Sequence, residues 1–243
     1  ETLKTNVFGT LNILESVRQL DLDVEKIDIA GTSEEYGSFD PSREEMYNRE
    51  NKEVVLDEKA PVNPQSIYGT SKVAADFLGR NFVDAYSLPV ITTRMFNNFG
   101  PRQSSEYITG TVITQALQND QVRLGNLSSS RDMCYVKDGV RGHIHAALEG
   151  EPGEVYNFGH GRSISMRDWV EMILRIGREN GFWGDVSIVQ DEDRYRPGDS
   201  EVKTLRSNSS KLRELTGWKP EYSWEEGLLR SISWYDDNKN VWK

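Results

Sequence analysis

The amino-acid sequence predicts an α/β fold, in which helices cover the faces of a parallel β-sheet. One observation is that helical and strand-like patterns alternate along the first half of the chain, as they do in βαβ units. Another is that "KIDIAGT" and "PVITTRMFNNFG" are short, apolar segments that end in polar or glycine residues, which is typical of buried parallel strands. The length of 243 residues is sufficient for one large domain or for two small domains that share an interface.

The elements of the first half follow in that alternating order. Residues 1–20 have leucine and valine at helical spacing and predict an amphipathic helix. Residues 26–32 predict a short buried strand, and the polar, acidic residues 38–60 predict a surface loop. A helix with Phe77 on its apolar side is expected over residues 66–86, before the second strand in "PVITTRMFNNFG".

The second half of the chain is divided into shorter elements. Ser165 and Ser223 directly precede two helical patterns and are expected to cap them. The expected strands cover residues 121–125, 131–136, 153–159 and 185–190, and the expected helices cover residues 110–119, 138–150, 166–180, 208–218 and 223–235.

Composition and charge disfavour several classes of protein. Hydrophobic residues make up 36% of the chain and charged residues 28%, which indicates a soluble globular protein. The formal net charge of -10 disfavours a nucleic-acid partner, and no apolar run approaches the ~20 residues of a membrane span.

The single cysteine, Cys134, fits a reducing cytoplasm and is expected in the core. His143 and His145 face apart on their predicted helix, so no metal site is predicted.

The stretches "AGTSEEYG" and "SIYGTSK" place reactive side chains at a strand end and at a helix start. Tyr68 and Lys72 are four residues apart and share one helix face, where the ammonium group is expected to lower the pKa of the phenol. Tyr68 would then serve as a general acid and base. Thr32 lies at the carboxyl end of the strand, where open α/β sheets bind ligands. Glu34 is expected on the same side of an extended backbone, where it could remove a proton next to a ketone.

These motifs, in this order, resemble the extended short-chain dehydrogenase/reductases. Within them the chain is similar to the NAD-dependent epimerase/dehydratase family, and most closely to its GDP-mannose 4,6-dehydratases. The similarity runs essentially from end to end, through "TNVFGTLNILESVR", "GTSEEYG", "YGTSK", "TRMFNNFGPRQ", "RDMCYVKD", "VYNFGHG" and "RYRPGDSEV".

The resemblance implies a fold and a domain division. The expected fold is a partial doubly wound (Rossmann-type) parallel sheet that lacks its N-terminal strands, with a smaller α+β C-terminal substrate domain. Residues 1–101 and 132–158 would form the remnant of the dinucleotide-binding and catalytic domain. Residues 102–131 and 159–243 would form the nucleotide-sugar-binding domain.

The resemblance also implies a mechanism. Thr32 and the Tyr68 phenolate would take the proton from the sugar 4-hydroxyl while a hydride passes to NAD or NADP. Glu34 would then remove the C5 proton, water would leave C6, and the hydride would return there. Lys72 would hold a ribose hydroxyl, and Asn6 in the first helix would support the proton relay.

Ser33 and Glu34 bear on which reaction is expected. Dehydratases for dTDP-glucose usually have Asp where this chain has Ser33, so Glu34 would also have to protonate the leaving hydroxyl. Related 4-epimerases tend to carry small residues in place of Glu34. Glu34 therefore favours dehydration, although a 4-epimerase or decarboxylase of the same family stays an alternative.

Further residues are expected to bind ligands because they match the family's binding segments. The sugar or diphosphate contacts would come from Asn97, Arg131, Asn157 and Arg196, and the cofactor contacts from Tyr68, Lys72 and Asn97. Arginine suits the diphosphate because its planar fork pairs with two phosphate oxygens at once.

The Gly-rich strand–turn–helix that receives a dinucleotide pyrophosphate has no counterpart in the sequence. We therefore expect either a fragment of a larger enzyme or a truncated relative, with impaired binding of NAD or NADP. The second possibility includes a non-catalytic relative that keeps only the nucleotide-sugar cleft. The resemblance implies a homodimer through the helices at residues 1–20 and 66–86.

Overall fold

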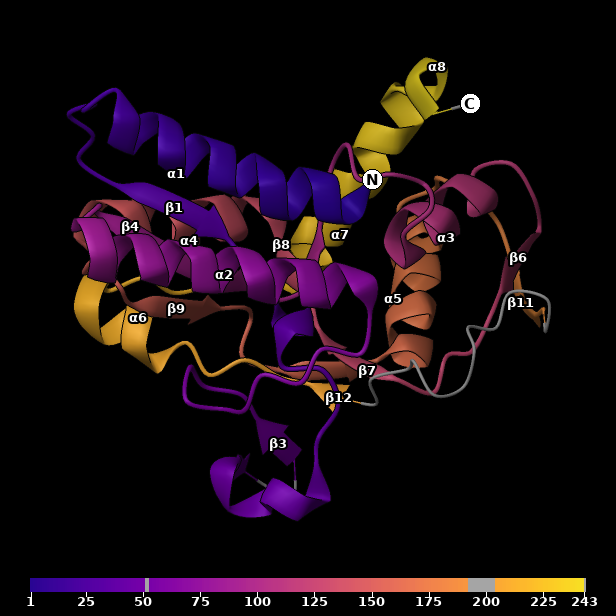
Figure 1. Cartoon of the computed structure of the whole chain (residues 1–243). Coiled ribbons are helices and arrows are strands. Elements are labelled where there is room, and N and C mark those ends of the chain that lie inside the picture. The colour runs from indigo at the N-terminus through magenta and orange to yellow at the C-terminus, as the bar shows by residue number, and fades with distance from the viewer. Residues whose placement is uncertain (51–52, 192–203, 243) are drawn as a thin grey trace.

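The computed structural model describes residues 1–50, 53–191 and 204–242 (Figure 1). A parallel sheet of three strands in the order β1-β4-β9 forms its central layer. These strands are β1 (Ile27–Ala30), β4 (Val90–Met95) and β9 (Val155–Phe158). The α/β class and the parallel sheet that the sequence predicts are therefore confirmed.

Helices cover both faces of this sheet (Figure 1). The helices of one face are α1 (Gly9–Gln19) and α2 (Ile67–Tyr86), and those of the other are α4 (Val136–Glu149) and α6 (Ser210–Thr216). Val90 packs with Ile29 in the first layer, whereas its neighbour Ile91 packs with Phe158 and Trp218 in the second. The central strand β4 therefore buries side chains on both faces, as expected for a strand between two layers of helices.

The second half of the chain builds a separate apolar core. Trp169, Ile173, Leu228 and Ile232 are fully buried at its centre. Its helices are α3 (Ile108–Ala116), α5 (Met166–Glu179), α7 (Trp224–Asp237) and α8 (Lys239–Trp242). Its short strands pair as β6 (Gln121–Leu124) with β11 (Ser187–Gln190), β5 (Asn98–Phe99) with β8 (Cys134–Tyr135), and β7 (Ser130–Asp132) with β10 (Ser163–Ser165) and β12 (Thr204–Leu205). Ser165 and Ser223 cap α5 and α7 as predicted.

The region expected to be a surface loop contains regular structure. It holds a 3₁₀ segment, η3 (Pro41–Met46), and an antiparallel pair of strands, β2 (Asn48–Glu50) and β3 (Glu53–Val55). The side chains of β2 are exposed, so the alternating apolar pattern of a strand is absent from the sequence. The segment is held instead by a small apolar cluster in which Tyr47 and Leu56 pack with Phe96.

The face that α2 buries also differs from the expectation. Phe77 is exposed, whereas Phe82 is buried as expected, together with small residues such as Ala75 and Gly79. A Cβ at Gly79 would lie 2.5 Å from the Ile29 Cδ1 atom, so this glycine allows the helix to lie directly on β1. The close contact matters because α2 carries half of the candidate site.

β1 lies at an edge of the sheet: among the described residues it pairs with β4 alone. In the same described part of the chain, no helix combines the length and the apolarity that crossing a bilayer requires.

Candidate active site

The turn that follows β1 carries the first half of the site. Thr32 caps a short 3₁₀ turn, η2 (Ser33–Glu35), and its Oγ1 accepts a hydrogen bond from the Glu34 N–H at 3.3 Å. The Glu35 Oε1 accepts a hydrogen bond from the Thr32 N–H at 2.9 Å, which completes a capping box. The chain thus turns after Thr32, and the expectation of an extended backbone from Thr32 to Glu34 is wrong.

Tyr68 and Lys72 form the second half of the site, on the first turns of α2. Ser66 caps this helix, because its Oγ accepts a hydrogen bond from the Gly69 N–H at 2.9 Å. Lys72 Nζ donates to the Ala30 carbonyl at the end of β1 at 2.8 Å, and it lies 5.8 Å from the centre of the Tyr68 ring. Lys72 therefore ties the helix to the strand end from which the turn departs.

The two halves meet at the Tyr68 phenol. The Thr32 hydroxyl is close enough to lower the pKa of Tyr68, and the Glu34 carboxylate is close enough to raise it. Ser66 Oγ also donates to Glu34 Oε2 at 3.1 Å, so the helix cap touches the carboxylate directly. The structure thus brings Thr32, Glu34, Tyr68 and Lys72 together.

The pKa of Tyr68 differs from the expectation. Burial is its largest perturbation and raises the pKa of the phenol, and the neighbouring Thr32 hydroxyl lowers it in part. Burial also lowers the pKa of Lys72, whose ammonium is turned toward the Ala30 carbonyl. The prediction that Lys72 lowers the pKa of the phenol is therefore wrong.

Ser66 and Gly69 are site residues that the sequence analysis did not single out. A Cβ at Gly69 would lie 2.8 Å from the Glu34 carbonyl oxygen, so only glycine lets the first turn of α2 approach the η2 turn this closely. The serine in "SIYGTSK" at the start of a helical pattern was a signal for the cap. No sequence signal indicated that the same hydroxyl would reach Glu34.

Asn6 is hydrogen-bonded to helix α2. It lies in a π-helical turn, η1 (Lys4–Phe8), that precedes α1. Its Nδ2 donates to Ser71 Oγ at 2.9 Å, and Ser71 Oγ donates to the Tyr68 carbonyl at 2.7 Å. This chain of hydrogen bonds joins the first helix to the turn that carries Tyr68.

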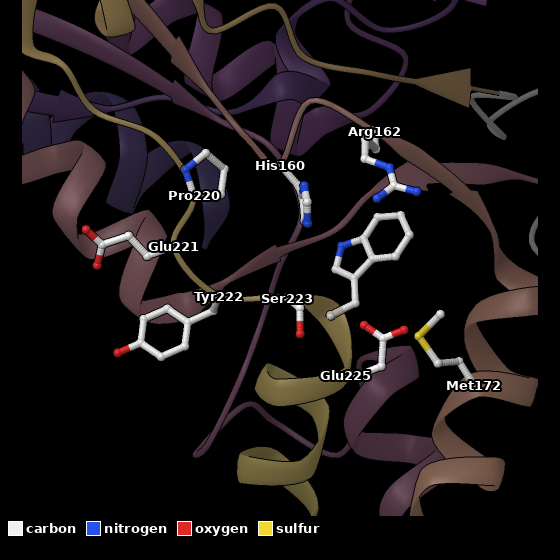
Figure 2. Close-up of a pocket in the computed structure, with 9 residues that line it drawn as sticks. His160, Arg162, Met172, Pro220, Glu221, Tyr222, Ser223 and Glu225 are labelled. Carbon is white, nitrogen blue, oxygen red and sulfur yellow. The ribbon is translucent and has the colours of Figure 1, made fainter.

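A hollow of about 340 Å³ lies in the second half of the chain, beside the loop after β9 (Figure 2). The Arg162 guanidinium lies 5.2 Å from the centre of the Trp224 ring, and the His160 ring meets the same indole at 4.9 Å. His160 Nδ1 is buried and has no hydrogen-bond partner among the described residues. Arg162 and His160 belong to the "VYNFGHG" region, yet the sequence analysis did not assign Arg162 a role.

The residues that were expected to bind sugar or diphosphate have different surroundings. Asn97 lies just beyond β4, and its buried Oδ1 has no hydrogen-bond partner in the described part of the chain, which fits a residue awaiting a donor group. Arg131 is half-buried in β7, and its Nη1 donates to the Ser130 carbonyl at 2.8 Å. Arg196 lies outside the described residues.

Asn157 occupies an internal position instead of a ligand-facing one. It is fully buried in β9. Its Oδ1 accepts a hydrogen bond from the Tyr36 hydroxyl at 2.8 Å, and its Nδ2 donates to the Leu56 carbonyl at 3.0 Å. Both ends of the amide are occupied by the protein, so the structure does not support substrate contact by Asn157.

The other reactive residues have structural partners. Cys134 is fully buried, as predicted, and burial raises the pKa of its thiol. His143 Nδ1 lies 2.7 Å from Asp28 Oδ2. Among the residues that the structure describes, no group of three or more potential ligands could hold a metal ion.

Comparisons with known proteins place these features in a family. The family model for GDP-mannose 4,6 dehydratase matches residues 1–230. A dTDP-glucose 4,6-dehydratase of Xanthomonas campestris pv. campestris is 31% identical over 98% of this chain and 67% of its own length. A dTDP-D-glucose 4,6-dehydratase of Mus musculus is 28% identical over 98% of this chain and 62% of its own length. The chain thus spans about two thirds of the length of these relatives, 62% in the second case.

Solved structures agree with this relationship. The dTDP-glucose 4,6-dehydratase of Bacillus anthracis in complex with NAD has a TM-score of 0.81 at 29% identity, over 99% of this chain and 70% of its own. The dTDP-glucose 4,6-dehydratase of Streptomyces venezuelae with NAD bound has a TM-score of 0.83 at 26% identity, over 99% of this chain and 68% of its own. The chain belongs to the GDP-mannose 4,6 dehydratase family, a branch of the NAD-dependent epimerase/dehydratases.

Proposed function

We propose that the protein acts as a nucleotide-sugar 4,6-dehydratase, which converts the hexose of a nucleotide-diphosphate sugar to its 4-keto-6-deoxy form. The observation that carries the proposal is the meeting of Thr32, Glu34 and Tyr68 beyond the carboxyl end of β1. The names of the relatives, which are dTDP-glucose 4,6-dehydratases, support the same reaction.

Tyr68 and Thr32 move the proton of the sugar 4-hydroxyl. Thr32 Oγ1 accepts its hydrogen bond from the Glu34 backbone, which leaves the hydroxyl proton free for the phenolate or the sugar oxygen. Once Tyr68 has lost its proton, its phenolate accepts the 4-hydroxyl proton as the alcohol becomes a ketone. Because burial raises the pKa of Tyr68, this step is expected to become faster as the pH rises. Lys72 uses one donor on the Ala30 carbonyl and retains two for a ribose hydroxyl.

Glu34 is the carboxylate of the turn that is available to the sugar. Ser33 is 3% exposed, and Glu35 is 0% exposed and already paired. Ser66 holds one carboxylate oxygen of Glu34, which leaves Oε1 for the substrate. Oε1 takes the C5 proton that the 4-ketone has acidified, and the same carboxyl then protonates the C6 hydroxyl, which leaves as water.

A cofactor site is expected where α1 faces β1. A hollow of about 280 Å³ there is lined by Asn6, Asp28, Ala30 and Lys72 among others. Its size and its Lys72 donors fit the nicotinamide ribose end of NAD or NADP. A Gly-rich cradle for the pyrophosphate is absent from the described residues. When bound, the nicotinamide supplies the transient oxidation at C4 and the reduction at C6.

The nucleotide diphosphate is expected in the second half of the chain. Arg162 and Arg131 lie near the ends of the short strands of this half and can donate to phosphate oxygens. The Asn97 amide oxygen, which has no partner among the described residues, can accept a hydrogen bond from a sugar hydroxyl. Ser33 favours GDP-mannose, whereas the names of the relatives favour dTDP-glucose. We therefore propose both GDP-mannose and dTDP-glucose as candidate substrates.

We also propose that the protein is cytoplasmic and forms a homodimer through residues 1–20 and 66–86.

The test is turnover of GDP-mannose and dTDP-glucose by the purified chain with added NAD or NADP, followed by alkaline ultraviolet detection of the 4-keto product. Glu34→Gln is expected to lower the rate about 10²–10⁴-fold. The control is Glu171→Gln, since Glu171 is exposed on α5 and lies 3.9 Å from the Arg167 guanidinium, away from Thr32 and Tyr68 in the sequence. A product epimerised at C4 without loss of water would favour a 4-epimerase, and sugar binding without cofactor binding or product would favour a non-catalytic relative.

A further inference from the structure

Arg94 is a charged side chain buried at the centre of the site region. It lies in β4 and is 1% exposed. Its guanidinium lies 4.9 Å from the centre of the Tyr36 ring. A buried charge of this kind is tolerated only when other groups pair with it and satisfy its hydrogen bonds. The partners of Arg94 come from two different elements.

One partner belongs to the η2 turn. Arg94 Nε donates to Glu35 Oε2 at 2.8 Å, and Glu35 Oε1 accepts the Thr32 N–H at 2.9 Å. The two oxygens of one carboxylate thus join the strand β4 to the residue that carries the candidate catalytic hydroxyl. A Cβ at Gly31 would lie 2.5 Å from Glu35 Oε1, so the glycine before Thr32 makes room for this carboxylate.

The other partner belongs to α2. Arg94 Nη2 donates to Asp76 Oδ2 at 2.5 Å, and Asp76 also accepts hydrogen bonds from Arg80 at 2.8 Å and Thr92 at 2.9 Å. Asp76 follows Lys72 by four residues, as Lys72 follows Tyr68, so all three share one face of the helix. The guanidinium is therefore held between the two elements that carry the halves of the site.

We propose that Glu35 is a positioning residue that, through Arg94 and Asp76, sets how the η2 turn lies against helix α2. The bridge keeps Thr32 beside Tyr68, and loss of Glu35 releases the turn from both the strand and the helix. The catalytic meaning of this placement rests on the proposed function, whereas the bridge itself is independent of any reaction. Neither the sequence analysis nor the comparisons assign Glu35 a role.

The charge of Glu35 also reaches the phenol through space. The groups that face Tyr68 are Glu34 and Glu35 from η2, the Tyr107 phenol from the segment before α3, and Lys72 from its own helix. The charge of Glu35 raises the pKa of Tyr68 and that of Lys72. Loss of this charge should therefore lower the pKa of Tyr68.

The test uses the full chain without substrate or cofactor, so its failure is distinct from failure of the proposed reaction. Tyrosines are labelled with ¹³C at Cζ, and the Tyr68 resonance is identified by its loss in Tyr68→Phe. In Glu35→Gln we expect the titration midpoint of Tyr68 to move away from the parent value, because the charge of Glu35 is lost and the Thr32 hydroxyl, which lowers the pKa of Tyr68, is released. Amide exchange at Thr32 should also become faster, because its N–H loses a charged acceptor.

A second variant separates positioning from simple stabilisation. The double variant Glu35→Leu with Arg94→Met replaces the buried ion pair by apolar side chains, an exchange that often preserves stability. We expect it to fold, because Asp76 keeps its hydrogen bonds with Arg80 and Thr92. It should nevertheless show a displaced Tyr68 midpoint and the same rapid Thr32 exchange. Glu171→Gln should leave both quantities at the parent values. Parent values of both quantities in the double variant, or in a folded Glu35→Gln, would overturn the proposal.

Discussion

The two parts of the molecule bury different kinds of side chain. Where β4 meets η2 and α2, the interior holds charges: Arg94 is 1% exposed, and Glu35 and Asp76 are 0% exposed. Where α3, α5 and α7 meet, the interior is apolar and aromatic, with Trp169 and Leu228 fully buried. The first part thus contains paired charges beside its apolar clusters, whereas the second is held by buried apolar surface.

The two kinds of buried side chain contribute differently to the free energy of unfolding. Burying apolar surface stabilises a fold by about 25 cal/mol per Å² and demands little directionality. Replacement of a whole buried ion pair by apolar side chains often changes stability little, whereas removal of one partner is costly because it leaves the other charge buried and unpaired. The site region therefore depends on charge and the second core depends on volume, and changes in pH should affect them differently.

The largest expected effect on stability is in the apolar core. Trp169→Ala removes a fully buried indole that packs against Phe99 and Trp224 and donates to Thr109 Oγ1 at 3.1 Å. We expect the free energy of unfolding to fall by about 4 kcal/mol, measured by urea denaturation. This loss should be the same at neutral and mildly acidic pH, because no charge is removed. The exposed Leu229→Ala on the same half is the control, and a comparable cost there would refute the distinction.

A smaller, pH-dependent effect is expected at Asp76. Burial is the largest single influence on the Asp76 carboxyl and raises its pKa. The hydrogen bonds and charges of Arg80 and Arg94 together outweigh burial, so the pKa of Asp76 is lowered. A carboxyl whose folded pKa is lowered stabilises the protein above its unfolded pKa of about 3.9, and this stabilisation is lost as the pH falls through the folded pKa. Asp76→Asn should therefore cost about 3 kcal/mol at neutral pH and progressively less below about pH 4.

The comparison of Asp76→Asn with Trp169→Ala is made by urea denaturation at several pH values. A cost of Asp76→Asn that stays constant down to the acid limit of folding would contradict a charge-based structure for the site region. If the loss in free energy of unfolding caused by Trp169→Ala depended on pH, the apolar core would also depend on charge, and the distinction between the two parts would be lost.

The smallest expected effect on stability is the loss of a helix N-cap, and it can distinguish a capping serine from one that also contacts Glu34. Ser66→Ala and Ser165→Ala each remove an N-cap hydroxyl, from α2 and α5, and each should lower the free energy of unfolding by about 1 kcal/mol. Ser66 also donates to Glu34, whereas Ser165 lies in the other half of the chain. Only Ser66→Ala should lower turnover, measured with the same 4-keto assay. Equal turnover in the two variants would mean that the contact between Ser66 and Glu34 has no part in the reaction.

Local chemistry explains which parts of the fold could be predicted from the sequence. The cap at Ser165 and the apolar strand ending at Ala30 are signals carried by neighbouring residues, and both elements formed as predicted. The strands β2, which is exposed, and β3, which is partly buried, could not be predicted, because their pairing depends on contacts with residues such as Phe96 that are distant in the sequence.

The residues of the candidate site could be predicted from the sequence, but their burial and their long-range partners could not. The motifs identified the neighbours of Tyr68, since the residue types and the helix spacing required no long-range information. The raised pKa of Tyr68 and the internal position of Asn157 could not be read, because both depend on burial. The role of Glu35 was hidden because its partner Arg94 lies 59 residues further along the chain.

The most direct test asks whether Thr32, Glu34 and Tyr68 face one bound sugar. The Tyr68 Cζ resonance of the labelled chain is followed as GDP-mannose or dTDP-glucose is added, with Glu34→Gln as the comparison. The account predicts a saturable shift of the Tyr68 resonance with at least one of the two sugars, altered in size in Glu34→Gln. Saturable binding detected elsewhere while the Tyr68 resonance stays unmoved, or no saturable binding of either sugar, would contradict it.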